Sequence, residues 1–260
     1  YRNYPRLVGE TGGKDFVFAC PDADLEGLAI RLVRGAFEYQ GQKCSAASRA
    51  YVPRSLWPQL KDRLVAILSE VRVGDVRDFR NFMGAVIDKA SFENIRSYIR
   101  LSDAGKDVKL ISGGICDSTN GWMIEPTLIE TSDPSHRLMT EEIFGPVLTI
   151  YPYPDRQLEE MLDLVDSTSP YALTGAVFSQ DRALIEKISW RLRYAAGNLY
   201  INDKPTGAIV GQQPFGGARA SGTNDKAGSH LNLLRWVSPR TIKETMTFPH
   251  AIGYPSMEEA

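Results

Sequence analysis

The chain has 260 residues, 43% of them hydrophobic and 24% charged, with 30 Lys and Arg nearly balancing 32 Asp and Glu, which is ordinary for a globular protein and gives no basic excess for nucleic acid. Its three cysteines form neither a C-x-x-C pair nor a zinc-ligand pattern, so a reducing compartment and no metal are expected. No apolar run approaches the ~20 residues that span a bilayer and no secretory signal begins the chain, so we expect a soluble protein without a membrane partner.

The first predicted elements are a strand and an amphipathic helix. The strand covers residues 14–20 and ends at Pro21, and the helix runs from about Asp24 to Tyr39. Apolar residues of this helix recur three and four positions apart and form one stripe: Leu25, Leu28, Ala29, Leu32, Val33, Ala36 and Phe37. The stripe predicts packing on a sheet, with a turn containing Cys44 at the end of the helix.

Strands and helices then alternate along the chain. Further strands are predicted over residues 49–52, 108–111, 123–130, 147–151, 173–178 and 198–202, and further helices over 55–71, 89–101, 157–165 and 182–193. This order predicts an α/β domain whose largely parallel sheet is flanked by helices. We place this domain at residues 1–203.

The character of the sequence changes after residue 203. Residues 204–232 are rich in Gly with little periodicity, and their aromatic and amide content favours a functional loop over disorder. Residues 233–244 are predicted to form a last strand at a sheet edge. An unpaired edge can bind another subunit, so residues 233–260 are predicted to be an oligomerisation strand and tail, and the protein a homo-oligomer.

Cys44 and Glu10 are the candidate reactive pair. Cys44 follows Gly41, Gln42 and Lys43 in a polar turn, where a thiol is reachable and its thiolate can be favoured. Glu10 precedes two glycines, at which the backbone can approach a ligand closely. The pair has the chemistry of a thiol nucleophile and its general base.

Four segments in order resemble the aldehyde dehydrogenase superfamily. They are ETGGK at 10–14, GQKC at 41–44, EEIFGPV at 141–147 and PFGG at 214–217. The runs at 37–46 and 206–226 resemble, within it, the branch that oxidises glutamate γ-semialdehyde in proline catabolism. One departure from that branch is Ala208, where a Ser is common; the backbone amides of Gly207 and Ala208 remain able to hold a carboxylate.

The resemblance implies NAD as cofactor and a role for each candidate residue. Cys44 would be the nucleophile and Glu10 the general base that activates water. Glu142 would hold the nicotinamide ribose, Phe144 would contact the nicotinamide, and Thr11 and Gly12 would lie beside the cofactor. Ser45, Gly207, Ala208 and Phe215 would bind the substrate, although Ser45 is equally interpretable as a turn residue and Phe144 alone as a core residue.

Other polar residues receive structural interpretations. Lys14 and Lys43 are interpreted as solvated, with Lys43 also able to lower the pKa of Cys44 by its charge. Cys20 is interpreted as a buried strand residue and Cys116 as a loop residue. His136, His230 and His250 have no metal-ligand spacing.

The resemblance also implies an N-terminal nucleotide-binding domain, with an oxyanion-stabilising Asn, that these residues do not contain. The chain is therefore expected to be the C-terminal portion of the enzyme, inactive alone, from the mitochondrial matrix if the source is eukaryotic and otherwise from the cytoplasm. Three alternatives remain: a noncatalytic oligomerisation module, an aldehyde dehydrogenase of other specificity, and a Cys44 thioesterase that uses no NAD.

Overall fold

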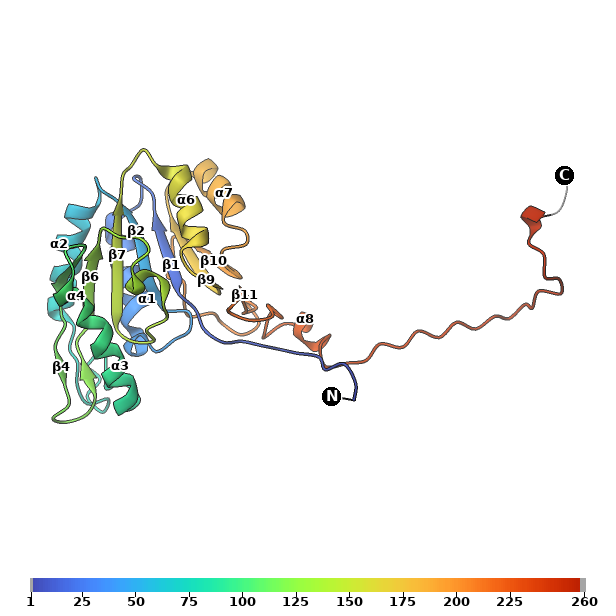
Figure 1. The fold of residues 1–260 in the computed structure, drawn as a ribbon, viewed down its shortest axis with the longest axis horizontal. Helices are drawn as coiled ribbons and strands as arrows, with labels where there is room; N and C mark the ends of the chain where they lie inside the picture. Colours follow the sequence, from blue (N-terminus) through green and yellow to red (C-terminus); the bar gives the residue numbers. More distant parts are fainter. Residues whose placement is uncertain (1, 258–260) are drawn as a thin grey trace.

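Seven strands form one central sheet in the order β10-β9-β1-β2-β7-β6-β3 (Figure 1). In the computed structural model, which describes residues 2–257, the strands are β1 (Asp15–Ala19), β2 (Ala47–Pro53), β3 (Val108–Ser112), β6 (Thr127–Thr131), β7 (Val147–Tyr153), β9 (Thr174–Phe178) and β10 (Asn198–Ile201). Neighbouring strands pair in parallel, except that β3 runs antiparallel to β6 at one edge. The predicted α/β fold with a largely parallel sheet is confirmed.

Helices cover both faces of this sheet (Figure 1). The longer ones are α1 (Leu25–Phe37), α2 (Trp57–Glu70), α3 (Lys89–Ile99), α6 (Leu158–Ser167) and α7 (Arg182–Arg191), and the short ones are α4 (Leu101–Ala104), α5 (Arg137–Thr140) and α8 (His230–Leu233). Among the described residues, no helix has both the length and the apolar character needed to cross a membrane.

The interior strand β1, third in the sheet, shows how the core is divided. Val17 and Ala19 pack into the cluster formed with α1 and α2, whereas Phe16 and Phe18 pack into the cluster formed with α6 and α7. Successive strand side chains point to opposite faces, so a strand covered on both faces reads as a continuous apolar run. This burial fixes the segment that leads from Glu10 into the sheet.

The turn that carries Cys44 needs an unusual backbone. Helix α1 ends at Phe37, two residues before the predicted end, and a 3₁₀ segment over Glu38–Gly41 follows. Within it Tyr39 and Gln40 have φ of 55° and 58°, and Gly41 has φ of 64°. A Cβ on Gly41 would lie 2.3 Å from the carbonyl oxygen of Gly145. Glycine is therefore required here, because the Cys44 turn touches the backbone of the segment that carries Phe144.

Two predicted elements differ in detail from the structure. The strand predicted over 123–130 is divided at residues 125–126 into β5 (Met123–Ile124) and β6, because Pro126 cannot donate a ladder hydrogen bond. Cys116, predicted in a loop, lies in the short strand β4 (Cys116–Asp117), which pairs with β5.

The C-terminal region is irregular, as predicted for 204–232, apart from α8 and β11 (Ala218–Arg219), which pairs antiparallel with β8 (Tyr171–Ala172). The strand predicted over 233–244 is wrong for this single chain: residues 234–236 form turns and 237–245 have no regular structure in the described part. A strand needs a hydrogen-bonded neighbour, and this tail leaves the body of the molecule (Figure 1) before the short helix η2 (Pro255–Met257). Residues 258–260 of the predicted tail, and residue 1, lie outside the described residues.

Candidate active site

Cys44 faces a cavity of about 610 Å³ at the end of the sheet. It lies in a tight turn between η1 and β2, closed by the amide of Ala46, which donates to the carbonyl of Lys43 at 3.0 Å. Other predicted site residues on the cavity wall are Thr11, Ser45, Phe144, Gly207, Ala208 and Phe215. The structure thus brings residues from four distant segments of the sequence to one thiol.

Among the described residues, Glu10 has the carboxylate that lies within hydrogen-bond distance of the Cys44 thiol. Its Oε1 lies 4.0 Å from Cys44 Sγ, within reach of a weak sulfur hydrogen bond. Glu10 is exposed and stands before the sheet begins. The backbone at Glu10 forms an isolated antiparallel bridge with Gly222. Glu10 can therefore meet both the thiol and water, as a general base must.

The electrostatics around Cys44 favour the thiol over the thiolate. Burial, followed by the charges of Glu10, Asp15 and Glu142, raises the pKa of Cys44 to about 11. The expectation that Lys43 lowers this pKa is wrong, because the Lys43 ammonium pairs with Glu38 at 3.2 Å. At neutral pH the thiol must therefore pass its proton to a base when it attacks.

A buried polar cluster beneath Cys44 escaped the sequence analysis. Lys14 is 1% exposed and donates to Ser48 Oγ at 2.7 Å, so its interpretation as a solvated side chain is wrong. Asp15 accepts the Thr174 amide at 2.6 Å, and Arg49 Nε donates to the Lys14 carbonyl at 2.8 Å. Burial lowers the pKa of Lys14 to about 7 and raises that of Asp15 to about 8.

The positions of Lys14 and Asp15 in the sequence could have predicted this buried cluster. Both residues open the strand predicted over 14–20, and that strand lies in the interior of the sheet, between β9 and β2, where side chains are buried on both faces. Buried charges need partners. A Lys-Asp pair at the start of a central strand therefore indicates a further buried cation or hydrogen-bond partner, here Arg49 on the neighbouring strand β2.

Ser45 is tied to the Gly-rich loop, and its hydroxyl has a specific partner. Ser45 Oγ and Thr206 Oγ1 lie 2.8 Å apart, and both residues are buried. Thr206 was not among the predicted site residues. Gly207, next in the chain, has φ of 89° and Ala208 follows it on the cavity wall. Paired hydroxyls beside open backbone amides suit an anionic group.

Glu142 and Phe144 lie on the other side of the thiol. Gly13 N donates to Glu142 Oε1 at 3.0 Å, and a Cβ on Gly12 would fall 2.2 Å from Glu142 Oε2. Phe144 has φ of 57° and is 44% exposed beside Cys44. A carboxylate acceptor in a glycine-lined recess next to an exposed aromatic ring fits the hydroxyls and flat ring of a nicotinamide riboside.

Comparisons with known proteins agree on one family. Residues 1–242 match the aldehyde dehydrogenase family. The chain is 60% identical over 257 residues to a mitochondrial delta-1-pyrroline-5-carboxylate dehydrogenase of Dictyostelium discoideum, covering 99% of this chain and 46% of that protein. It therefore spans about half the length of this curated relative.

Solved structures give the same result at the level of the fold. The delta-pyrroline-5-carboxylate dehydrogenase of Mycobacterium tuberculosis superposes with a TM-score of 0.89 at 50% identity, over 99% of this chain and 48% of that one. The same enzyme bound with NAD superposes with a TM-score of 0.88 at 50% identity, over 99% and 47%.

Proposed function

The chain belongs to the aldehyde dehydrogenase family, and from this we propose that the full-length protein oxidises L-glutamate γ-semialdehyde to glutamate with NAD through a thioester on Cys44. The observation that carries the proposal is the 4.0 Å approach of Glu10 Oε1 to Cys44 Sγ, a thiol that lines a cavity together with the hydroxyl pair of Ser45 and Thr206. Relatives at 50–60% identity are named for this activity, and one solved relative holds NAD.

The first step makes the aldehyde carbon able to release hydride. The Cys44 thiol gives its proton to solvent, and the sulfur forms a bond to the carbonyl carbon. The carbonyl electron pair moves to oxygen, where the backbone amide of Cys44 stabilises the alkoxide. NAD, when bound, supplies the acceptor for the hydride that this carbon then loses. Cys44 is left as a thioester.

Hydrolysis of the thioester needs a base that water can reach. Glu10 is not used in the first step, so its exposed carboxylate takes a proton from water as the oxygen attacks the acyl carbon. The C–S bond breaks, the carboxylic acid leaves, and the thiolate of Cys44 regains a proton. The raised pKa of Cys44 favours that return to the thiol.

The polar end of the cavity supports a substrate with its own carboxylate. Ser45 and the Thr206–Ala208 segment present a hydroxyl pair and backbone amides there, and Phe215 lines the cavity as an apolar wall for the carbon chain. Ala208 supplies no hydroxyl, so the anchor depends on Ser45, Thr206 and the backbone. Glutamate γ-semialdehyde carries an α-carboxylate at a distance from its aldehyde, which matches this arrangement.

We assign the nicotinamide end of NAD to Glu142, Phe144, Thr11 and Gly12. Glu142 would accept from ribose hydroxyls, and the exposed Phe144 ring would lie against the nicotinamide beside the thiol. Gly12 leaves room for the Glu142 carboxylate next to the backbone. Thr11 is fixed by hydrogen bonds to the carbonyls of Ala220 and Ser221.

The experiment that tests this function is NADH formation by the full-length protein with glutamate γ-semialdehyde and, separately, with simple aliphatic aldehydes. Wild type is compared with Cys44→Ala. Activity with the semialdehyde that disappears with Cys44 supports both nucleophile and substrate. Activity with simple aldehydes alone would keep the family and refute the substrate, and NADH formation that survives Cys44→Ala would refute the nucleophile.

The C-terminal tail favours self-association of the full-length protein. Its large apolar side chains are exposed in the single chain, among them Trp236, Ile242 and Phe248. Burying such side chains against a second copy would stabilise an oligomer. Light scattering of the full-length protein, with and without residues 238–260, tests this. We further assign the mitochondrial matrix as compartment if the source is eukaryotic, because eukaryotic relatives are named mitochondrial.

A further inference from the structure

The general base of the proposed function stands on a segment that the sheet does not hold. Glu10 is exposed, and β1 begins five residues later at Asp15. Its neighbours are hydrogen-bonded instead to the loop that follows β11. Thr11 N donates to Ser221 O at 3.1 Å, Gly9 N donates to Thr223 Oγ1 at 2.9 Å, and Thr223 N donates to Gly9 O at 3.0 Å. The position of Glu10 therefore depends on residues 220–223.

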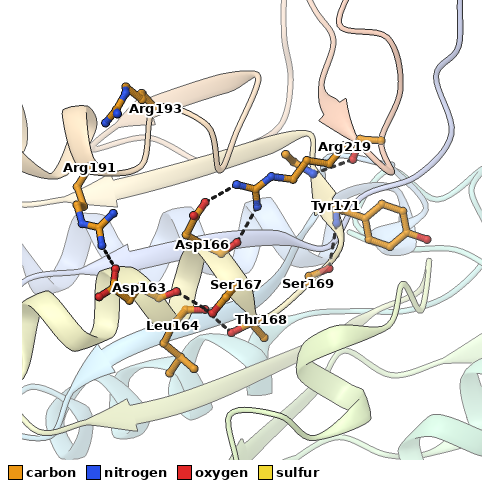
Figure 2. A network of polar contacts seen from close by, with 12 residues as sticks. Asp163, Leu164, Asp166, Ser167, Thr168, Ser169, Tyr171, Arg191, Arg193 and Arg219 are labelled. Carbon is orange, nitrogen blue, oxygen red and sulfur yellow. Dashed lines mark hydrogen bonds and ion pairs between the residues drawn. The ribbon is translucent and has the colours of Figure 1, made fainter.

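That loop is fixed in turn by an arginine fork. Figure 2 shows the Arg219 guanidinium directed at Asp166, where Nη1 donates to the backbone carbonyl at 2.7 Å and Nη2 donates to Oδ1 at 2.6 Å. Arg219 has φ of 55°, so its backbone is in the left-handed region that residues other than glycine rarely adopt. Beside it, Ala220 N donates to Pro170 O at 3.1 Å. Arg219 is one side-chain tie between this loop and the body, and the buried Ser221 Oγ, which accepts the Ala172 amide at 3.1 Å, is another.

Asp166 is a well-placed acceptor for this tie. It is the second-last residue of α6 (Leu158–Ser167), where backbone carbonyls have no partner inside the helix. A cation is favoured at this end of a helix by the helix dipole. Two parallel hydrogen bonds, one to the main chain and one to the carboxylate, define the angle of the guanidinium as well as its distance.

We propose that Arg219 is a positioning residue for Glu10: by binding Asp166 it fixes residues 219–223, and these hold Glu10 where it activates water for thioester hydrolysis. The proposal rests on the proposed function for the role of Glu10. Arg219 does not line the cavity at Cys44, so it acts through the loop. A misplacement of about 1 Å at a catalytic group can cost roughly 100-fold in rate.

The same helix offers a matched control. Arg191 pairs with Asp163, one helical turn before Asp166, and Figure 2 draws both pairs. Arg191 belongs to α7, so its pair joins two helices and touches neither the loop 219–223 nor the Glu10 segment. Arg191→Met therefore removes an ion pair from α6 of the same kind as Arg219→Met without releasing Glu10.

The test is a double-mutant cycle in the full-length protein with glutamate γ-semialdehyde and NAD. Turnover is measured for wild type, Arg219→Met, Glu10→Gln and the double variant, and acid-quenched samples are weighed intact to quantify acylated Cys44. We expect Arg219→Met to slow turnover by about 10-fold to 100-fold and to accumulate the acyl-enzyme. Arg219→Lys restores part of the rate, Arg191→Met retains it, and Arg219→Met has no further effect once Glu10 is Gln.

Each contrary result overturns the proposal. Equal slowing by Arg219→Met in the wild-type and Glu10→Gln backgrounds would show that Arg219 acts elsewhere, and so would slowing without acyl-enzyme. If Arg219→Met does not fold, Asp166→Asn is measured in the same cycle with the same criteria. Failure of the proposed function is separate: it appears as turnover that Cys44→Ala or Glu10→Gln leaves unchanged.

Discussion

The seven residues from Gly9 to Asp15 approach one thiol in two different ways. At the far end Lys14 and Asp15 are buried beneath Cys44, held by the central sheet and by Arg49. At the near end Glu10 is exposed and held by hydrogen bonds to a loop from the other end of the chain. We call these the floor and the rim of the site. Cys44, the proposed nucleophile, therefore lies over a packed core, whereas Glu10, the proposed base, is held by loop contacts at the surface.

The largest expected effect is on kcat, and it tests whether the rim contributes to turnover without supporting the fold. Glu10→Gln should lower kcat of the full-length protein by about 100-fold to 10,000-fold, because a positioned general base contributes that much. Its melting temperature should stay at the wild-type value, since Glu10 is exposed. Steady-state NADH kinetics and calorimetry measure the two quantities. A large fall in melting temperature would mean that the rim also supports the fold.

The matching change in the floor should affect stability first. Arg49→Met removes a buried guanidinium and leaves the Lys14 carbonyl, to which Arg49 Nε donates, without that partner; it should cost about 1–3 kcal/mol of unfolding free energy. Arg63→Met is the control, because it breaks the exposed pair with Glu26 and should cost under about 1 kcal/mol. Urea unfolding measures both. Equal costs would contradict the division into floor and rim.

A smaller effect is expected at the glycine between rim and floor. Gly12→Ala places a methyl group against the Glu142 carboxylate, a flexible side-chain end that can move aside. We expect stability to change little and the KM for NAD to rise about 10-fold, equivalent to one lost hydrogen bond to a charged group. Steady-state kinetics at varied NAD measures this. An unchanged KM for NAD would remove Glu142 from the cofactor site.

The smallest effect concerns the thiol itself. Because burial and the Glu10 charge raise the pKa of Cys44, Glu10→Gln should lower that pKa and speed alkylation by iodoacetamide several-fold at pH 8. The rate without NAD should rise with pH up to about 11. Cys44→Ala supplies the background from the other cysteines. An alkylation rate that falls in Glu10→Gln would show that Glu10 already acts as the base toward the thiol in the free enzyme.

Local sequence patterns predicted most of the helices and strands. The apolar stripe of α1 and the continuous apolar run of β1 are properties of neighbouring residues, so the sequence specifies them before any tertiary contact forms. The end of α1 was less predictable, because the left-handed turn at Tyr39 and Gln40 exists to bring Gly41 against Gly145, 104 positions along the chain. The strand predicted over 233–244 is wrong for a related reason. A strand forms only when it hydrogen-bonds to a neighbouring strand, and the described part of this chain provides no such neighbour for the tail.

Sequence motifs likewise predicted many of the site residues, and the structure shows the contacts that hold them in place. Cys44, Ser45 and Phe144 could be chosen from their segments, and the cavity brings them together. Thr206 and Arg219 lie in the run 206–226 that carries the resemblance, but their partners Ser45 and Asp166 are 161 and 53 positions away, so no local pattern gives these contacts. Lys14 was wrongly predicted to be solvated because lysine is usually exposed. It is buried because β1 lies in the interior of the sheet.

The most direct test is to identify the residue that carries the acyl group when Glu10, the proposed base, is replaced. Full-length Glu10→Gln is mixed with glutamate γ-semialdehyde and NAD, quenched in acid, digested and mapped by mass spectrometry. The account predicts a glutamyl thioester on Cys44 that accumulates in Glu10→Gln, is absent from Cys44→Ala, and is formed together with NADH. NADH formation with no adduct, or an adduct on another residue, would contradict it.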